Sequence, residues 1–141
     1  MTNDVKMLNK QKVIARLAHL GDYMFNAVQH QLATEVDDLV AAQRRAAPIN
    51  KDKSDTPGTF RDSIHGYPNP DRPLSYRIIA DAKDEKGNFI GPHIEFGHLT
   101  IDGKQVAARP SFFPTYRARK KGMQRRINAA ARKAAKALFE E

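Results

Sequence analysis

The first third of the chain carries apolar side chains at helical spacing. They recur every three or four residues, which places them on one face of a helix from about Val5 to Arg45. The apolar positions are Val13, Ile14, Leu17, Leu20, Met24, Val28, Leu32, Val36, Leu39 and Val40. Gly21-Asp22 is the weak point of the pattern and could divide the helix in two. A continuous helix would be longer than about 50 Å, so two packings stay open: against a neighbouring subunit, or bent over a sheet of its own chain.

The next residues alternate between turn-forming and strand-like stretches. Residues 49–57 are polar and predict a flexible loop, and Thr59 or Ser54 can cap a short helix that ends near Ile64. Residues 65–73 hold three prolines and a glycine, so they predict a connection between elements. Residues 75–82 alternate as a strand does, with Tyr76, Ile78 and Ala80 on one face.

A second strand is expected over residues 89–96. Within it Pro92–Phe96 alternates, with Ile94 and Phe96 on one face and His93 and Glu95 on the other. This segment is expected to return along residues 75–82 as an antiparallel hairpin or meander. Asp102-Gly103 predicts a turn within residues 100–106, and this segment could add to the same small sheet.

The last quarter of the chain predicts a basic helix from about Pro114 to Phe139. Its apolar and alanine positions recur at helical spacing, and cations fill the remaining surface. The cations are Arg117, Arg119, Lys120, Lys121, Arg125, Arg126, Arg132, Lys133 and Lys136. The predicted fold class is therefore α+β, with a long N-terminal helix, a small antiparallel β-sheet and a long basic C-terminal helix in a single domain over residues 1–141.

Composition narrows the classes of function. The formal net charge is +8, which favours a polyanionic or acidic partner. The chain has no cysteine, which excludes disulfides and thiolate metal sites. No stretch reaches the length of a membrane-spanning helix, and the N-terminus lacks the apolar segment of a secretory signal, so no membrane partner is expected. The basic helix could meet DNA, meet an acidic protein surface, or simply face solvent.

Candidate catalytic and metal-binding residues are sparse. His93, Glu95 and His98 could hold a metal ion, but an exposed or interface surface is the favoured interpretation. Asp62, Ser63 and His65 hold the residue types of a hydrolase triad. They are adjacent in sequence, however, whereas triad members converge from separate elements. We expect no enzymatic activity and no cofactor.

Two further interpretations concern the segment before the last helix. Glu95 is either an exposed strand residue or the partner of Arg109 in an ion pair that fixes the register of two segments. Phe112 and Phe113 are expected to fill the core where sheet meets helix, although one of them could instead anchor a subunit contact.

Three motifs in order resemble the tail-component family of long-tailed bacteriophages, the gene-product-ten-like group of head–tail joining and tail-completion proteins. They cover residues 35 to 140, most of the chain. Glu95-Phe96-Gly97 resembles the family's Glu-Phe-Gly, and Ala108-Arg109-Pro110-Ser111-Phe112-Phe113 resembles its Ala-Arg-Pro-Phe-Leu. Upstream, Ala47-Pro48 and the run from Gly58 through Asp62 and Ser63 to Ile64 resemble its Ala-Pro, Thr-Gly and Leu-Arg-Asp-Ser-Ile. Ser111 before the aromatic pair and the longer polar loop depart from the pattern.

The resemblance implies a structural protein of a phage or prophage virion, at the neck or tail end, assembled in the bacterial cytoplasm. It implies a homo-oligomeric ring, expected to be a hexamer, that joins or completes the tail. The neighbours would be the head–tail connector and the tail tube or terminator proteins, with DNA in the channel as a further contact. The expected basic contact surface is Arg117, Lys120, Lys121, Arg125, Arg126, Arg132, Lys133 and Lys136. The alternative is a basic DNA-binding protein without sequence specificity.

Overall fold

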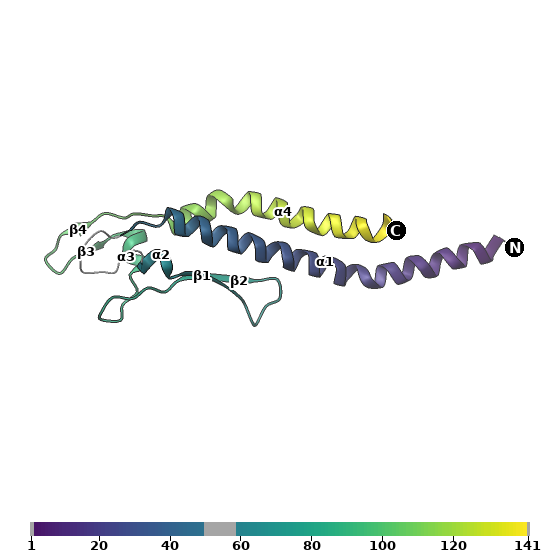
Figure 1. Ribbon diagram of the computed structural model, residues 1–141, viewed down its shortest axis with the longest axis horizontal. Coiled ribbons are helices and arrows are strands. Elements are labelled where there is room, and N and C mark those ends of the chain that lie inside the picture. Colours follow the sequence, from purple (N-terminus) through teal and green to yellow (C-terminus); the bar gives the residue numbers. More distant parts are fainter. Residues whose placement is uncertain (1, 50–58, 141) are drawn as a thin grey trace. The chain divides into compact units, whose positions relative to one another are not determined.

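The fold was analysed in a computed structural model that describes residues 2–49 and 59–140, with side chains from residue 10 onward. The elements in chain order are α1 (Thr2–Ala46), α2 (Thr59–Asp62), β1 (Ile64–Pro68), β2 (Tyr76–Ala80), α3 (Gly91–Phe96), β3 (His98–Leu99), β4 (Gln105–Val106) and α4 (Phe112–Glu140) (Figure 1). The predicted mixture of two long helices with small antiparallel sheets is confirmed.

The chain divides into two compact units. Unit 1 is Met1–Ala33 with Gly122–Glu141, and unit 2 is Thr34–Lys121. Each of the two long helices therefore contributes one part to each unit. That the whole chain folds as one domain stays a prediction.

Unit 1 consists of the first part of α1 and the last part of α4. The two helices run antiparallel, and the Arg16 guanidinium donates a hydrogen bond of 3.5 Å to the Phe139 carbonyl. Leu20 and Met24 on α1, and Ile127 and Leu138 on α4, are only half-buried. Among the described residues of this unit, Met123 is the one buried apolar side chain. The helix pair thus covers its apolar faces incompletely.

Unit 2 contains a true hydrophobic core. Its buried apolar residues come from the end of α1, from α2 and from the strands: Val36, Leu39, Val40, Ala42, Ala47, Phe60, Ile64 and Ala82. The antiparallel pair β1–β2 lies against α1, with Gly66 opposite Ile78 in the register. A Cβ on Gly66 would lie 2.5 Å from Val36 Cγ1, so the strand reaches the helix closely only because this residue is glycine.

The pairing of the first sheet differs from the prediction. Residues 65–73 were expected to be a connection, but β1 occupies their first part and pairs with β2. The three prolines do not prevent this, because Pro68 ends the strand and the other two follow it. The expected return strand over residues 89–96 is reduced to one isolated bridge between Lys83 and Phe89.

The prediction of a strand over Pro92–Phe96 is wrong. These residues belong to the short helix α3, which has Pro92 in its first turn and Gly97 at its C-terminal cap. Proline suits that position because a first-turn amide has no helical partner. The alternation of apolar and polar residues over five positions was too short to distinguish strand from helix.

Other predicted boundaries hold. The Asp102-Gly103 turn is present, with Gly103 at φ 74°, and it joins β3 to β4. The short helix α2 begins at Thr59, and α1 runs through Gly21 without a break.

Gly58 and the predicted flexible loop over 49–57, apart from Ile49, lie outside the described residues. None of the described helices combines the length and apolarity needed to cross a membrane.

Candidate functional site

The centre of the Glu95-Phe96-Gly97 motif is a buried carboxylate that caps α4. Glu95 is 6% exposed. Its Oε2 accepts hydrogen bonds from the Ser111 amide at 2.8 Å and the Phe112 amide at 3.1 Å, and its Oε1 accepts one from the Phe113 amide at 3.0 Å. These are first-turn amides that have no partner within the helix. A carboxylate there is stabilised both by the hydrogen bonds and by the positive end of the helix dipole.

Both interpretations of Glu95 are wrong: it does not pair with Arg109, and it is a buried helix residue rather than an exposed strand residue. Because residues 91–96 are helical, the Glu95 side chain meets the start of α4, and its oxygens bind backbone amides. Arg109 contributes through its backbone instead, since its amide donates to the Ile94 carbonyl at 2.8 Å. The Arg109 side chain is exposed. The motifs Glu-Phe-Gly and Ala-Arg-Pro are thus joined, but through hydrogen bonds that sequence reasoning missed.

Gly97 holds the same junction together. It adopts φ 73°, and a Cβ there would lie 2.7 Å from the Val106 carbonyl oxygen and 2.9 Å from the Ala108 nitrogen. Both the left-handed backbone and the close approach require glycine. Gly97 therefore lets the segment after α3 turn back against the strand that leads to Ala108, Arg109 and Pro110. Ala108 and Pro110 are themselves exposed.

Upstream motif residues connect α2 and β1 to the end of α1. The Arg44 guanidinium donates to the Ile64 carbonyl at 2.9 and 2.6 Å and contacts His65 Nδ1 at 3.2 Å. Ser63 Oγ donates to the Phe60 carbonyl at 2.8 Å. Asp62 is exposed at the end of α2. Ser63 therefore bonds to the Phe60 carbonyl and His65 contacts Arg44, so these two side chains do not form the hydrogen bonds of a catalytic triad.

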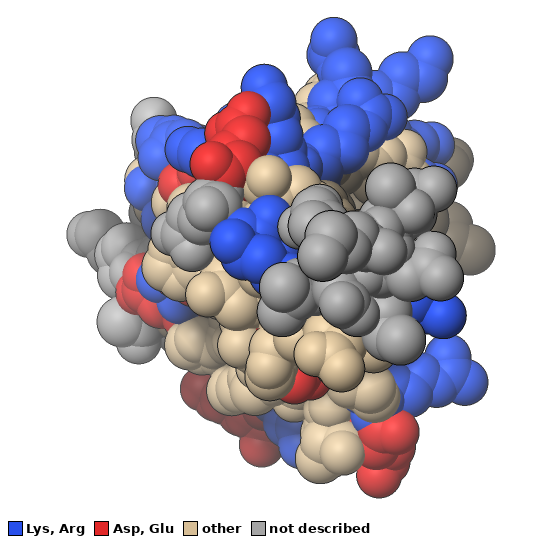
Figure 2. All heavy atoms as spheres, turned by 90° about the vertical axis from the view of Figure 1, so that its right-hand side faces the viewer, with Lys and Arg blue, Asp and Glu red and all other residues tan. Residues whose placement is uncertain are grey.

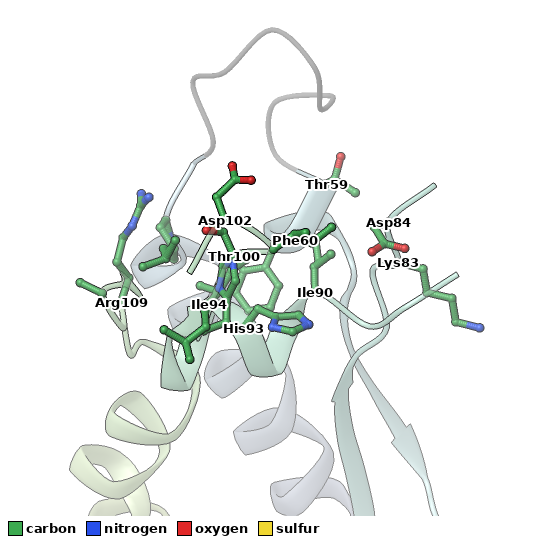
Figure 3. Close-up of a pocket in the computed structure, with 16 residues that line it drawn as sticks. Thr59, Phe60, Lys83, Asp84, Ile90, His93, Ile94, Thr100, Asp102 and Arg109 are labelled. Atoms are coloured by element: carbon green, nitrogen blue, oxygen red, sulfur yellow. The ribbon is translucent and has the colours of Figure 1, made fainter. Parts of the chain in front are cut away.

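A cavity of about 720 Å³ opens beside α2 and α3 in unit 2. Its lining includes Phe60, Ile90 and Ile94 together with the charged residues Lys83 and Asp84. Figure 3 shows Phe60 in the middle of this group, with Lys83 and Asp84 to one side and Arg109 to the other. The β3–β4 turn borders the cavity through Thr100 and Asp102 (Figure 3).

His93 and His98 also line this cavity and lie edge to face, with ring centroids 4.8 Å apart. Glu95 is turned away to the amides of α4, so the sequence-proposed set of His93, Glu95 and His98 is not assembled. Within the described ranges, no cluster of three or more histidine or acidic side chains is placed to hold a metal ion.

The aromatic residues of the motifs form a partly exposed cluster. Phe113 lies 6.1 Å from Phe96 and 5.3 Å from Phe112 between ring centroids. Phe112 is half-buried, and its carbonyl accepts a hydrogen bond of 3.0 Å from the Gln43 side chain. Phe113 is 45% exposed. The expectation that both phenylalanines fill the core is therefore wrong for Phe113, because Glu95 fixes the helix start so that this side chain faces outward.

Among the exposed apolar side chains of the described residues, two groups lie close together in the sequence. The first, on α1 in unit 1, comprises Val13, Ile14 and Leu17, which are 48%, 54% and 52% exposed. We call it the 13–17 surface. The second, from α3 to the β3–β4 turn in unit 2, comprises Phe96, Leu99 and Ile101, which are 70%, 70% and 95% exposed. We call it the 96–101 surface.

The predicted basic surface divides between the units. Arg117, Lys120 and Lys121 belong to unit 2, and the other five cations belong to unit 1. All five are exposed, and the helical repeat places them within about 120° on the side opposite Ile127 and Leu138. We call Arg125, Arg126, Arg132, Lys133 and Lys136 the basic face. Figure 2 shows Lys and Arg side chains gathered over the top of the view.

Comparisons with protein-family models, with curated proteins and with solved structures gave no match to this chain.

Proposed function

We propose that this protein is a self-assembling structural component of a phage or prophage virion, at the neck or tail end, that acts by binding. The observation that carries the proposal is the exposure of the 13–17 and 96–101 surfaces. Large apolar side chains grouped on a surface mark sites of protein association more often than isolated ones do. The motif resemblance supplies the setting, with the head–tail connector and tail tube or terminator proteins as neighbours.

The architecture of the motifs agrees with a structural role. Glu95, Gly97 and the Arg109 amide together fix how the chain enters α4. A rigid helix start is useful to a subunit that must repeat the same contact with each neighbour. In this proposal Glu95, Gly97 and Arg109 hold the subunit's shape, and the exposed apolar residues, Phe96 of the same motif included, make the contacts.

The test is light scattering on the purified protein at low salt and at 0.5 M salt, where the Debye length falls to about 4 Å. A ring held by apolar contacts should keep its mass at high salt, and electron microscopy should show closed particles with a uniform number of subunits. A protein that stays monomeric at both salts, over a wide range of concentration, would overturn the self-assembly that this function requires.

A second candidate function, binding DNA without sequence preference, is favoured by the basic face. Its five cations are exposed and separated from the apolar side of α4, so they could contact several phosphates together. Replacing Arg132, Lys133 and Lys136 by glutamine should lower the salt slope of DNA binding by about 3. A slope that does not change would show that these residues do not contact phosphates.

A further inference from the structure

The pair β1–β2 has two outer edges, and its hydrogen bonds show which backbone groups lie on them. The Asn69 amide donates to the Ser75 carbonyl at 2.8 Å, and the Asp81 amide donates to the Ser63 carbonyl at 3.4 Å. Opposite residues of an antiparallel pair alternate between hydrogen-bonded and non-hydrogen-bonded pairs. Between these two bonds, the residues of the non-hydrogen-bonded pairs therefore direct their backbone groups to the outer edges. They are Ile64, Gly66 and Pro68 on β1, and Tyr76, Ile78 and Ala80 on β2.

The edge of β1 is protected in two ways. The Arg44 guanidinium of α1 donates to the Ile64 carbonyl at 2.9 and 2.6 Å. Pro68 has no amide, and in its outward position it removes no hydrogen bond from the pairing with β2. Prolines and covering side chains are common means of protecting the edge of a sheet. A further strand is therefore not expected beside β1.

The edge of β2 is covered only at its end. A Cβ on Gly91 would lie 3.6 Å from the Ala80 carbonyl oxygen, so the chain passes close to the edge there. From Gly91 onward the chain forms α3 and does not continue as a third strand. The amides and carbonyls of Tyr76 and Ile78 have no hydrogen-bond partner among the described residues. These four groups, spaced two residues apart, match the backbone of an added extended strand.

The side chains beside this edge indicate which strand would fit. Arg77 and Ile79 lie on the face opposite to Ile78, because side chains alternate along a strand. Both are exposed, Ile79 by 38%. The Arg77 guanidinium forms no ion pair within the described part of the chain. An acidic side chain opposite Arg77 and an apolar one opposite Ile79 would give favourable cross-strand pairs.

A second copy of β2 does not meet these requirements. Antiparallel pairing of Tyr76 with Ile78 of a second copy would use all four free groups, but it places Arg77 opposite Arg77. Like charges directly opposite each other destabilise a strand pair. The register that avoids this pairs Tyr76 with Ala80, whose edge is already approached by Gly91. The charge thus favours a segment of a different protein.

We propose that the edge of β2 at Tyr76 and Ile78 binds an extended segment of another protein by strand addition. The added strand is antiparallel, which is the slightly more stable arrangement per residue. It carries an acidic residue opposite Arg77 and, two residues earlier, an apolar residue opposite Ile79. This contact goes beyond the self-assembly of the proposed function, because it joins the protein to a partner of a different kind.

The probe is a capped and fluorescently labelled peptide, Thr-Thr-Val-Thr-Glu-Thr-Thr. Fluorescence anisotropy should show saturable binding, and hydrogen-exchange mass spectrometry should show slower exchange at residues 76–78. N-methylation of the threonine between valine and glutamate removes an amide that faces β2, so it should weaken binding by roughly tenfold. N-methylation of the glutamate is the matched control, because that amide faces away from β2 and its loss should leave binding unchanged.

Two variants of the protein test the same edge. Tyr76→Pro removes an outward amide from β2, as Pro68 does in β1, and should weaken binding by roughly tenfold. Tyr76→Val keeps the amide and should bind the peptide as the wild type does. Arg77→Glu should weaken binding of the glutamate peptide by about two- to fivefold and strengthen binding of a lysine version by a similar factor.

Three results would overturn the inference. The first is a wild-type protein that does not bind the peptide, and the second is equal binding by the wild type, Tyr76→Pro and Arg77→Glu. The third is self-association that Tyr76→Pro abolishes, because β2 would then bind a second copy. If Tyr76→Pro fails to fold by circular dichroism, the exchange of charges at Arg77 and the two methylated peptides decide the question. Failure of the strand addition leaves the proposed function standing, because self-assembly is measured separately by light scattering without the peptide.

Discussion

The two units of this protein bury their apolar side chains to different extents. Unit 2 buries Leu39 and Ile64 almost completely and satisfies its buried Glu95 with three hydrogen bonds. Unit 1 is a pair of helices in which the described large apolar side chains other than Met123 remain half-buried or exposed. Unit 2 has a core of its own, whereas the helix pair of unit 1 covers its apolar faces incompletely. Changes in the core of unit 2 should therefore alter folding, and changes at the exposed apolar residues of either unit should alter association.

The largest effect is expected at Glu95. Glu95→Ala leaves three amides at the start of α4 without their acceptor, each in a buried or partly buried position. Hydrogen bonds to a charged group contribute about 1.5–3 kcal/mol each and are not additive, so the free energy of unfolding should fall by about 3 kcal/mol or more. Urea unfolding measures this change.

Glu85→Ala is the control for this prediction, because Glu85 is exposed in the turn after Lys83. It should change the free energy of unfolding by less than about 0.5 kcal/mol. If the two substitutions had equal effects, the cap would not stabilise unit 2 and the contrast between the units would lose its main support.

The next largest effect is expected at Gly97. Gly97→Ala places a Cβ against the Val106 carbonyl and strains a left-handed backbone, which should cost about 2–3 kcal/mol in urea unfolding. Gly103 has φ 74° but open space around it, so Gly103→Ala should cost only about 1 kcal/mol. The difference between the two substitutions isolates the close approach. Equal losses would show that backbone strain alone acts at Gly97.

Residues 10–17 of unit 1 should respond to protein concentration, whereas the β1–β2 pair in unit 2 should not. The amides of residues 10–17 should exchange with solvent quickly in dilute protein and slowly in concentrated protein, because association covers the 13–17 surface. The amides of β1 and β2 should exchange at the same rates in both samples. Hydrogen-exchange mass spectrometry measures both segments in one experiment, and protection of residues 10–17 that is independent of concentration would contradict this contrast.

The smallest effect is expected at Asp84, in an exposed turn of unit 2. Hydrogen bonds from the Asn88 backbone amide and side chain, and from the Lys86 amide, hold the pKa of this carboxyl below its ordinary value of 3.8. Because the folded pKa is the lower one, the stabilisation is present above the unfolded value and is lost as the pH falls through the folded pKa. The Asn88 amide resonance should therefore titrate with a midpoint below 3.8, and Asp84→Asn should remove the titration. A midpoint at or above 3.8 would show that the turn does not favour the charged carboxylate.

The sequence alone was sufficient to predict the two long helices and the Asp102-Gly103 turn. Long amphipathic stretches keep their period over many residues, and a turn dipeptide acts through local backbone geometry. Short segments gave less reliable predictions. Five alternating residues over Pro92–Phe96 predicted a strand, yet Pro92 in a first turn and Gly97 at a cap produce a helix. The prolines of residues 65–73 likewise predicted a connection where β1 begins, although Pro68 only ends that strand.

The tertiary structure decided what the motif residues do. Sequence reasoning identified Glu95, Arg109 and the aromatic pair as a related group, but for Glu95 it offered only an exposed strand position or an ion pair with the Arg109 side chain. The helical form of residues 91–96 turns the carboxylate toward the start of α4, where free backbone amides compete successfully for it. Sequence also marked Val13, Ile14 and Leu17 as apolar, but only the structure shows that they are exposed. A long local pattern determines an element's type, whereas the burial of a side chain depends on which neighbours the fold supplies.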